Sequence, residues 1–188
     1  MTTVADWHTR ALDAAGRIVA AIPADRWQAA TPCPEWDVRG LVNHLVSGNL
    51  WAAELGAGAT IEQVGGRLDG DRLGADPAAA YAASASAASD VFHRPGALDT
   101  PCAVSYGPVP GSVYAGHRFI DVLIHGWDLA TATGQDATLG DDLVDACRQI
   151  AEPQAELLRA SGAFAREVPV LPDATAQARL LALLGRTS

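Results

Sequence analysis

Residues 117–130 of this chain read HRFIDVLIHGWDLA, which combines the apolar spacing of a buried helix with several ionisable side chains. On a helix that turns about 100° per residue, the polar side chains fall on one face roughly 100° wide, and apolar side chains cover the remainder. That face holds Tyr114, His117, Arg118, Asp121, His125 and Asp128. The chain must therefore fold so that one packed helix presents all of this chemistry in a single direction.

Helical periodicity extends over most of the sequence. Asp37 and the Asp76-Pro77 pair are typical of helix starts, and Gly134 is typical of a helix end. The main helices are predicted at about 4–21, 37–55, 76–93 and 112–133, with a further helix from 141 that Pro153 ends or kinks. A short amphipathic helix is predicted at about 174–184, after an extended piece at 167–173.

These elements predict an all-α four-helix bundle with long connections and a short C-terminal amphipathic helix, in a single domain over residues 1–188. The connections 56–75 and 94–111 are expected to frame the mouth of a pocket. No strand-forming segment of useful length is predicted. The third helix is rich in small residues, which fits internal packing or a homodimer contact, so a monomer or a homodimer is expected.

Charge composition excludes several functions. The formal net charge is -9, and all 13 basic residues are arginine. Without lysine there is no Schiff-base, P-loop or kinase-type lysine. An acidic chain without a basic cluster is also not expected to bind nucleic acid. No apolar run is long enough for a membrane span, and the first residues do not have the pattern of a signal peptide, so a cytoplasmic protein is expected.

Three cysteines, Cys33, Cys102 and Cys147, are odd in number, lie far apart and form no CxxC pair. This spacing predicts neither a disulfide framework nor a cysteine-ligated zinc site. We expect the cysteines to be small buried or half-buried groups. The tryptophans Trp36, Trp51 and Trp127 are interpreted as core anchors.

Asp121 and His125 stand at i and i+4, a spacing that places two side chains over the same point of a helix, as two helical ligands of one metal require. His44 lies at the margin of the apolar side of the second helix. Two imidazoles and a carboxylate on neighbouring helices would form a three-ligand metal site with open positions. The alternatives are a solvated polar face on the fourth helix and a core histidine at position 44.

Two motifs carry a resemblance to a known family. W-D-V-x5-H at 36–44 and D-x3-H-G-W-D-L-A at 121–130 resemble the DinB-like metal-binding four-helix-bundle superfamily. Within it, TPCPEWDVRGLVNHLV, DVLIHGWDLATATGQD and the terminal RLLALLGR are most similar to the mycothiol-dependent maleylpyruvate isomerase-like branch. The resemblance spans nearly the whole chain.

The resemblance implies a divalent metal held by His44, Asp121 and His125. The founding isomerase pattern has glutamate where this chain has Asp121, and this shorter side chain is expected to bring the metal closer to its helix or to bind it less tightly. The isomerase also has a separate C-terminal substrate-binding domain, for which too few residues follow the predicted bundle. The resemblance therefore implies a metal site and thiol chemistry rather than isomerisation of maleylpyruvate itself.

The working hypothesis is an enzyme that uses a divalent metal, most simply Zn²⁺, to activate a low-molecular-weight thiol. The resemblance implies mycothiol as that thiol, with a small electrophilic substrate and S-transfer or isomerisation as the reaction. Arg118 is predicted either to orient an anionic substrate or cofactor or to pair with Asp121 or Asp128. Asp128 and Tyr114 are predicted to support the ligands.

Other readings of the same residues remain open. His117 is interpreted as a hydrogen-bonded flank, a spare ligand or a proton shuttle. The site could also belong to a metal-binding or stress-related module without turnover, or to an Fe(II) enzyme that uses oxygen, since two histidines and one carboxylate suit that metal too. A further alternative is an interaction domain with a solvated polar stripe.

Overall fold

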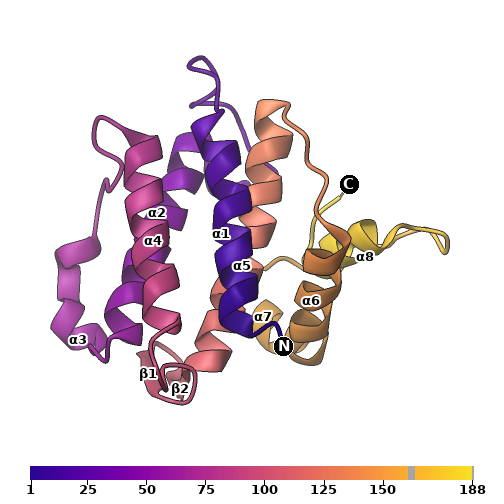
Figure 1. The fold of residues 1–188 in the computed structure, drawn as a ribbon. Helices are drawn as coiled ribbons and strands as arrows, with labels where there is room; N and C mark the ends of the chain where they lie inside the picture. The colour runs from indigo at the N-terminus through magenta and orange to yellow at the C-terminus, as the bar shows by residue number, and fades with distance from the viewer. Residues whose placement is uncertain (161–163, 188) are drawn as a thin grey trace. The chain divides into compact units, whose positions relative to one another are not determined.

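The computed structural model describes residues 1–160 and 164–187, which divide into two compact units at residues 1–137 and 138–188. The first unit contains four long helices and a small hairpin (Figure 1). Its elements are α1 (Val4–Ala20), α2 (Val38–Gly56), α3 (Ile61–Val64), the 3-10 helix η1 (Gly65–Leu68), α4 (Pro77–Phe92), β1 (Pro101–Val104), β2 (Gly107–Pro110) and α5 (Gly111–Thr133). The prediction of an all-α fold is confirmed, and the prediction of a single domain stays a prediction.

The helix boundaries follow local capping chemistry. The side chain of Thr3 accepts a hydrogen bond from the backbone N–H of Asp6, and the carboxylate of Asp6 accepts one from the backbone N–H of Thr3, which closes a capping box on α1. Asp37 accepts from the backbone N–H of Gly40 at the start of α2. Gly134 ends α5 in the left-handed conformation, with a φ of 71°. All main helices lie within two residues of their predicted bounds.

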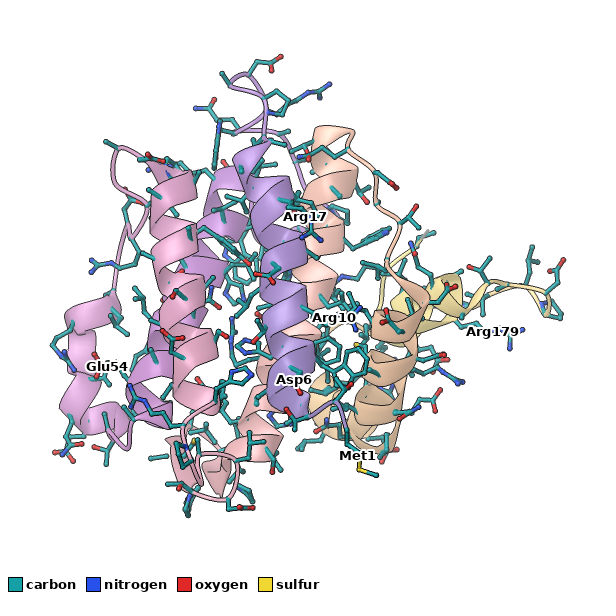
Figure 2. The ribbon with its side chains drawn as sticks, in the orientation of Figure 1. Met1, Asp6, Arg10, Arg17, Glu54 and Arg179 are labelled. Carbon is teal, nitrogen blue, oxygen red and sulfur yellow. The ribbon has the colours of Figure 1, made fainter. Side chains whose placement is uncertain are left out.

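The four long helices pack as a ring in the order α1, α5, α2 and α4. Figure 1 shows that α2 descends toward α3 while α5 rises from the hairpin, so these two neighbours run in opposite directions. Arg17 projects from the solvent-exposed side of α1 (Figure 2). The ring places apolar side chains from all four helices in one core, including Leu12, Leu41, Leu45, Tyr81, Phe92, Phe119, Ile120 and Leu123.

The sequence predicts no strand-forming segment of useful length, and the structure adds two short strands, β1 and β2, of four residues each. They form an antiparallel hairpin in which Cys102 pairs with Val109 and Val104 pairs with Gly107. Prolines at positions 101, 108 and 110 lower the strand propensity of both segments, so residue propensities do not predict strands here. An edge strand nevertheless tolerates proline at positions where no backbone N–H is needed for strand pairing. Gly107 has a φ of 111°, which few other residues adopt, and it follows the two-residue turn Ser105-Tyr106.

The second unit contains α6 (Asp141–Ala151), the 3-10 helix η2 (Glu152–Gln154), α7 (Ala155–Ala160) and α8 (Ala176–Leu183). Pro153 lies in η2, directly after α6, as the sequence predicted. Residues 167–173 form no regular element, and the backbone N–H of Val168 donates to the carbonyl of Ala182. Leu180 and Leu181 of α8 are fully buried.

Two predictions from composition can be compared with the structure. All three cysteines are buried, and none forms a disulfide among the described residues, which confirms their interpretation as small buried groups. Among residues 1–160 and 164–187, the structure contains no helix that is both long and apolar enough to span a membrane.

Candidate metal centre

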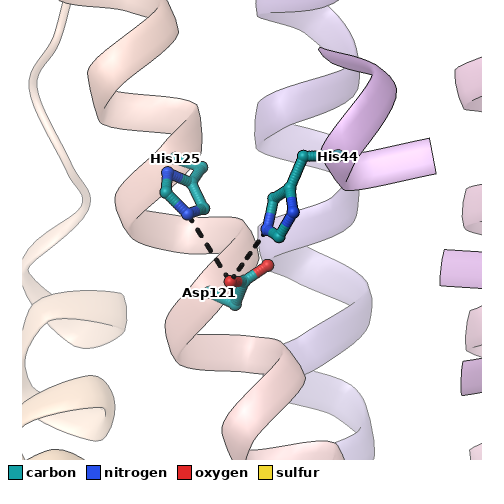
Figure 3. Close-up of side chains that lie close together, drawn as sticks. All are labelled: His44, Asp121 and His125. Carbon is teal, nitrogen blue, oxygen red and sulfur yellow. Dashed lines mark hydrogen bonds and ion pairs between the residues drawn. The ribbon is translucent and has the colours of Figure 1, made fainter. Parts of the chain in front are cut away.

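Three side chains from two helices converge on the face where α2 and α5 meet (Figure 3). His44 comes from α2, while Asp121 and His125 lie one turn apart on α5. The helix α5 is buried over most of its circumference, and within its polar stripe Arg118, His125 and Asp128 are buried while Asp121 is half-buried against α2. The predicted alternative of a solvated stripe is therefore wrong for this part of the helix.

The three ligand atoms have the spacing of a metal site. Nε2 of His44 lies 3.3 Å from Oδ1 of Asp121, and Nε2 of His125 lies 3.5 Å from the same oxygen. One ligand atom from each residue falls within 4.8 Å of the others. Nitrogen and oxygen ligands about 2.0–2.1 Å from a tetrahedral zinc ion are separated by about 3.3 Å. The donor set and its spacing thus fit a divalent cation with little rearrangement.

Arg118 holds the second oxygen of the same carboxylate. Its Nη1 donates to Oδ2 of Asp121 over 2.9 Å, which leaves Oδ1 directed at the two imidazoles. Burial alone would raise the pKa of Asp121, but the charges of Arg118, His44 and His125 together hold it well below its usual range. Asp121 is therefore a carboxylate at any pH near neutrality and is ready to accept a cation.

His125 is oriented by Asp128 from the opposite side of its ring. Nδ1 of His125 lies 2.9 Å from Oδ2 of Asp128, and the Asp128 side chain is completely buried. A carboxylate accepts but does not donate, so Nδ1 carries a proton, and in the neutral ring Nε2 is the nitrogen that can bind a cation. This is the supporting contact that the sequence predicted for Asp128.

Trp36 packs against the imidazole rings of both candidate histidine ligands. Its ring stacks on that of His44 with centroids 4.3 Å apart and planes 21° from parallel, and it meets His125 edge-on at 5.7 Å. Thr31 fixes the loop by donating its hydroxyl hydrogen to the carbonyl of Trp36. Trp36 was interpreted as a core anchor, but the structure places it against two of the three candidate ligands.

A buried chain of polar contacts continues behind the carboxylate. Nη2 of Arg118 donates to the side-chain carbonyl of Asn49, whose amide donates to Ser84 on α4. Arg118 reaches Asn49 by crossing Gly48, where an added Cβ would lie 2.6 Å from both terminal guanidinium nitrogens. Sequence analysis missed Gly48 and Asn49, although an isolated glycine inside a helical pattern often signals a close approach.

Two other polar residues of α5 lie away from the three ligand atoms. Tyr114 is two turns from Asp121, and its ring meets Phe92 edge-on at 5.9 Å. His117 forms a hydrogen bond through Nδ1 with the hydroxyl of Tyr106 in the hairpin turn. No contact of Tyr114 with the candidate ligands occurs within the described residues, so the structure does not bring it to the triad.

An apolar pocket of about 310 Å³ lies beside Tyr114 and Tyr106. Its walls come from α2, α3, the hairpin and α5. Both long connections, 56–75 and 94–111, thus contribute side chains to a pocket.

The fold and these contacts define an antiparallel helical bundle with a two-histidine, one-carboxylate candidate metal centre. The chain belongs to the family of the mycothiol maleylpyruvate isomerase N-terminal domain, whose model matches residues 8–130. That match lies inside the first unit, contains all three candidate ligands and confirms the resemblance predicted from the motifs.

Two proteins of Mycobacterium tuberculosis are similar to this chain over nearly its full length. One comes from strain CDC 1551 and the other from strain H37Rv, and both are described as uncharacterized. Each is 38% identical over 189 residues, which cover 96% of this chain and 96% of the relative. No solved structure matches the chain.

Proposed function

We propose that this protein is a divalent-metal-dependent enzyme that activates a low-molecular-weight thiol of the mycothiol type. The reaction is transfer of the thiol sulfur to a small electrophile, or isomerisation by addition and elimination. The observation that carries the proposal is the convergence of two imidazole nitrogens on one carboxylate oxygen, at 3.3 and 3.5 Å. Membership of the family supports mycothiol as the thiol.

The residues present fit a divalent cation held by His44, Asp121 and His125, and Zn²⁺ suits this donor set. A bound cation of this kind supplies positive charge that lowers the pKa of a thiol, so that thiolate is present near neutral pH.

The surrounding residues of the chain keep these donors in place. Arg118 occupies Oδ2 of Asp121, so the carboxylate offers one oxygen in a fixed direction. Asp128 accepts a hydrogen bond from the Nδ1–H of His125 and so favours the neutral tautomer whose Nε2 can bind a cation. Trp36 stacks on His44 and restricts rotation of that ring. Each contact is formed before any ligand arrives, which lowers the ordering cost of binding.

Exposure of the site favours a catalytic over a purely structural metal. The side chains of His44 and Asp121 retain 30% and 20% of their exposure, while His125 retains 3%. Structural zinc sites are closed by four protein ligands, whereas catalytic sites keep a position open to water or substrate. Three protein donors at a partly open face match the second type.

Metal content of the purified protein tests the first half of the proposal. We expect about one divalent ion per chain, and alanine at both His44 and His125 should remove it. His93→Ala is the matched control, because His93 lies on the surface and pairs with Asp6 instead of the candidate ligands. Full occupancy in the double alanine variant would overturn the proposed site.

Thiol-dependent turnover tests the second half. The metal-loaded protein should accelerate consumption of an electrophile in the presence of mycothiol, and the double alanine variant should not. A stoichiometric metal without any acceleration would instead support a metal-binding module that lacks turnover. The identity of the metal, read from the same analysis, separates a zinc enzyme from an Fe(II) enzyme.

A further inference from the structure

The apolar pocket beside the hairpin has the shape and lining of a small-ligand site. Trp51 and Leu55 form its α2 wall, Tyr114 its α5 wall, and Val104 and Tyr106 its hairpin wall. Its volume of about 310 Å³ lies at the lower end of the range for ligand pockets, which limits the occupant to about one or two rings.

Helix register places this pocket on the same side of the α2–α5 pair as the candidate metal centre. Trp51 follows His44 by seven residues on α2, and Tyr114 precedes Asp121 by seven residues on α5. Seven residues are two turns, or about 10 Å along the axis, and they return a side chain to nearly the same face. Because α2 and α5 run in opposite directions, both steps lead in the same direction along the interface of the two helices. Arg118, one turn from Asp121, lies over Gly48 between the two levels.

Apart from Ser105, the lining is aromatic and aliphatic, and none of its described side chains carries a formal charge. Ile61 and Tyr106 at its rim are 39% and 54% exposed, which places large hydrophobic surface in water around a cavity. Burial raises the pKa of Tyr114 to about 12, so its hydroxyl remains a neutral donor. Such walls favour a neutral ring that stacks on aromatic faces and accepts a hydrogen bond.

Arg118, the cation between these two levels, already has partners for its charge. The terminal nitrogens of Arg118 donate to Asp121 and Asn49, and its side chain is 9% exposed. Recruiting it for a substrate carboxylate would break a buried ion pair and leave Asp121 uncompensated, which is strongly unfavourable. This geometry favours the pairing alternative that the sequence left open for Arg118.

From these observations we propose that the pocket binds the neutral, apolar ring of an aromatic electrophile, and that the enzyme does not select dicarboxylate or other anionic substrates. This inference rests on the proposed function, because it names the substrate class of that same site.

A suitable probe pair is methyl 4-chloro-3-nitrobenzoate and the anion 4-chloro-3-nitrobenzoate, which share one ring and differ in charge. In the transfer reaction the thiolate sulfur forms a bond to the ring carbon that carries chlorine. The carbon–chlorine bond then breaks, chloride leaves with the bonding electron pair, and the thiol proton has passed to solvent. No oxidant or reductant is needed.

Calorimetric titration without thiol tests the pocket separately from turnover. The neutral ester should bind the full chain at least about tenfold more tightly than the anion, a difference of about 1.4 kcal/mol. Ile61→Trp, which fills the rim, should weaken ester binding by at least about tenfold. Val113→Trp is the matched control, since Val113 is also 39% exposed but does not line the pocket. Equal binding by Ile61→Trp and the unchanged protein, or tighter binding of the anion, would overturn the inference.

Turnover with mycothiol then separates the two proposals. Each rate is divided by the rate with thiol alone, because the two electrophiles differ in intrinsic reactivity. Acceleration of the ester, with a higher KM and little changed kcat in Ile61→Trp, supports both proposals. Acceleration of the anion alone overturns the substrate class and leaves the proposed function standing. Ester binding at the rim without any turnover supports the pocket and overturns the proposed function.

Discussion

Nη1 of Arg118 lies 2.9 Å from Oδ2 of Asp121, on the side of the carboxylate away from the two candidate imidazole ligands. The same guanidinium is held by Asn49, so its position is fixed by α2 as well as by α5. The arginine therefore determines which carboxylate oxygen is available and in which direction it points. It acts on the candidate metal centre through the carboxylate.

Replacing Arg118 by methionine tests this positioning role. Methionine keeps much of the apolar stem but leaves Oδ2 of Asp121 without its partner, so the carboxylate is free to rotate. Loss of a contact of this kind typically weakens metal binding by about 10- to 100-fold. Competition with a chelator of known zinc affinity measures the change. Unaltered zinc affinity in Arg118→Met would show that the arginine does not orient the ligand.

Gly48→Ala tests the same contact from the opposite helix. An added Cβ would lie 2.6 Å from the guanidinium nitrogens, so Arg118 must move from its present position. We expect weaker zinc binding in the same direction as for Arg118→Met, although alanine is the better helix former. Gly126→Ala is the matched control, because its Cβ would meet only Ala15, whose Cβ lies 3.3 Å away. Equal zinc affinity in both glycine variants would contradict the steric argument.

The sequence predicted the two ligands on α5 because their relationship is local. A spacing of four residues places Asp121 and His125 one above the other on any α-helix, whatever the helix packs against. The supporting role of Asp128 follows from the same periodicity, since it lies about one turn from His125 on the same face. His44 lies on another helix, so helical spacing alone did not predict that it meets Asp121. The resemblance of its motif to the family predicted that contact.

Contacts that depend on loops or on the absence of a side chain were not predictable in this way. Trp36 lies in the loop before α2, and hydrogen bonds from the Thr31 hydroxyl to the carbonyls of Cys33 and Trp36 hold this loop so that the Trp36 ring contacts His44. Tyr106 contacts His117 because it lies in the turn of the hairpin, and the prolines of that hairpin prevented its strands from being predicted. Gly48 matters for the space it leaves to Arg118, and a sequence gives no direct measure of such space.

Asp128→Asn tests the orientation of His125. Asparagine keeps the size of the buried side chain but removes its charge, so it is a weaker acceptor for the Nδ1 proton. We expect zinc affinity to fall by about 10- to 100-fold. Asp145→Asn on α6 is a control for removal of one negative charge, because Asp145 lies in the other unit. Retention of full zinc affinity by Asp128→Asn would remove Asp128 from the candidate metal centre.

Burial of His8 on α1 destabilises the fold, and we expect this to appear as a pH dependence of the free energy of unfolding. Its side chain is fully buried, and neither ring nitrogen has a hydrogen-bond partner among the described residues. Burial, reinforced by the charges of Arg118 and His93, lowers the pKa of His8 from 6.5 to about 3. Between these values the unfolded chain binds a proton that the folded protein does not, so the free energy of unfolding falls as pH falls.

His8→Leu should therefore stabilise the protein increasingly toward acid. The variant removes a buried polar group that has no hydrogen-bond partner. Its gain in free energy of unfolding over the unchanged protein should grow between pH 7 and pH 5, where protonation of His8 in the unfolded chain contributes about 2 kcal/mol. Urea denaturation of both proteins with a chelator present measures the difference.

His93→Gln provides a control of opposite sign. A hydrogen bond to the Ser89 carbonyl raises the pKa of His93, so its contribution to stability is present at low pH and lost as pH rises. Parallel pH profiles for His8→Leu and the unchanged protein would mean that His8 finds a partner for its proton inside the bundle.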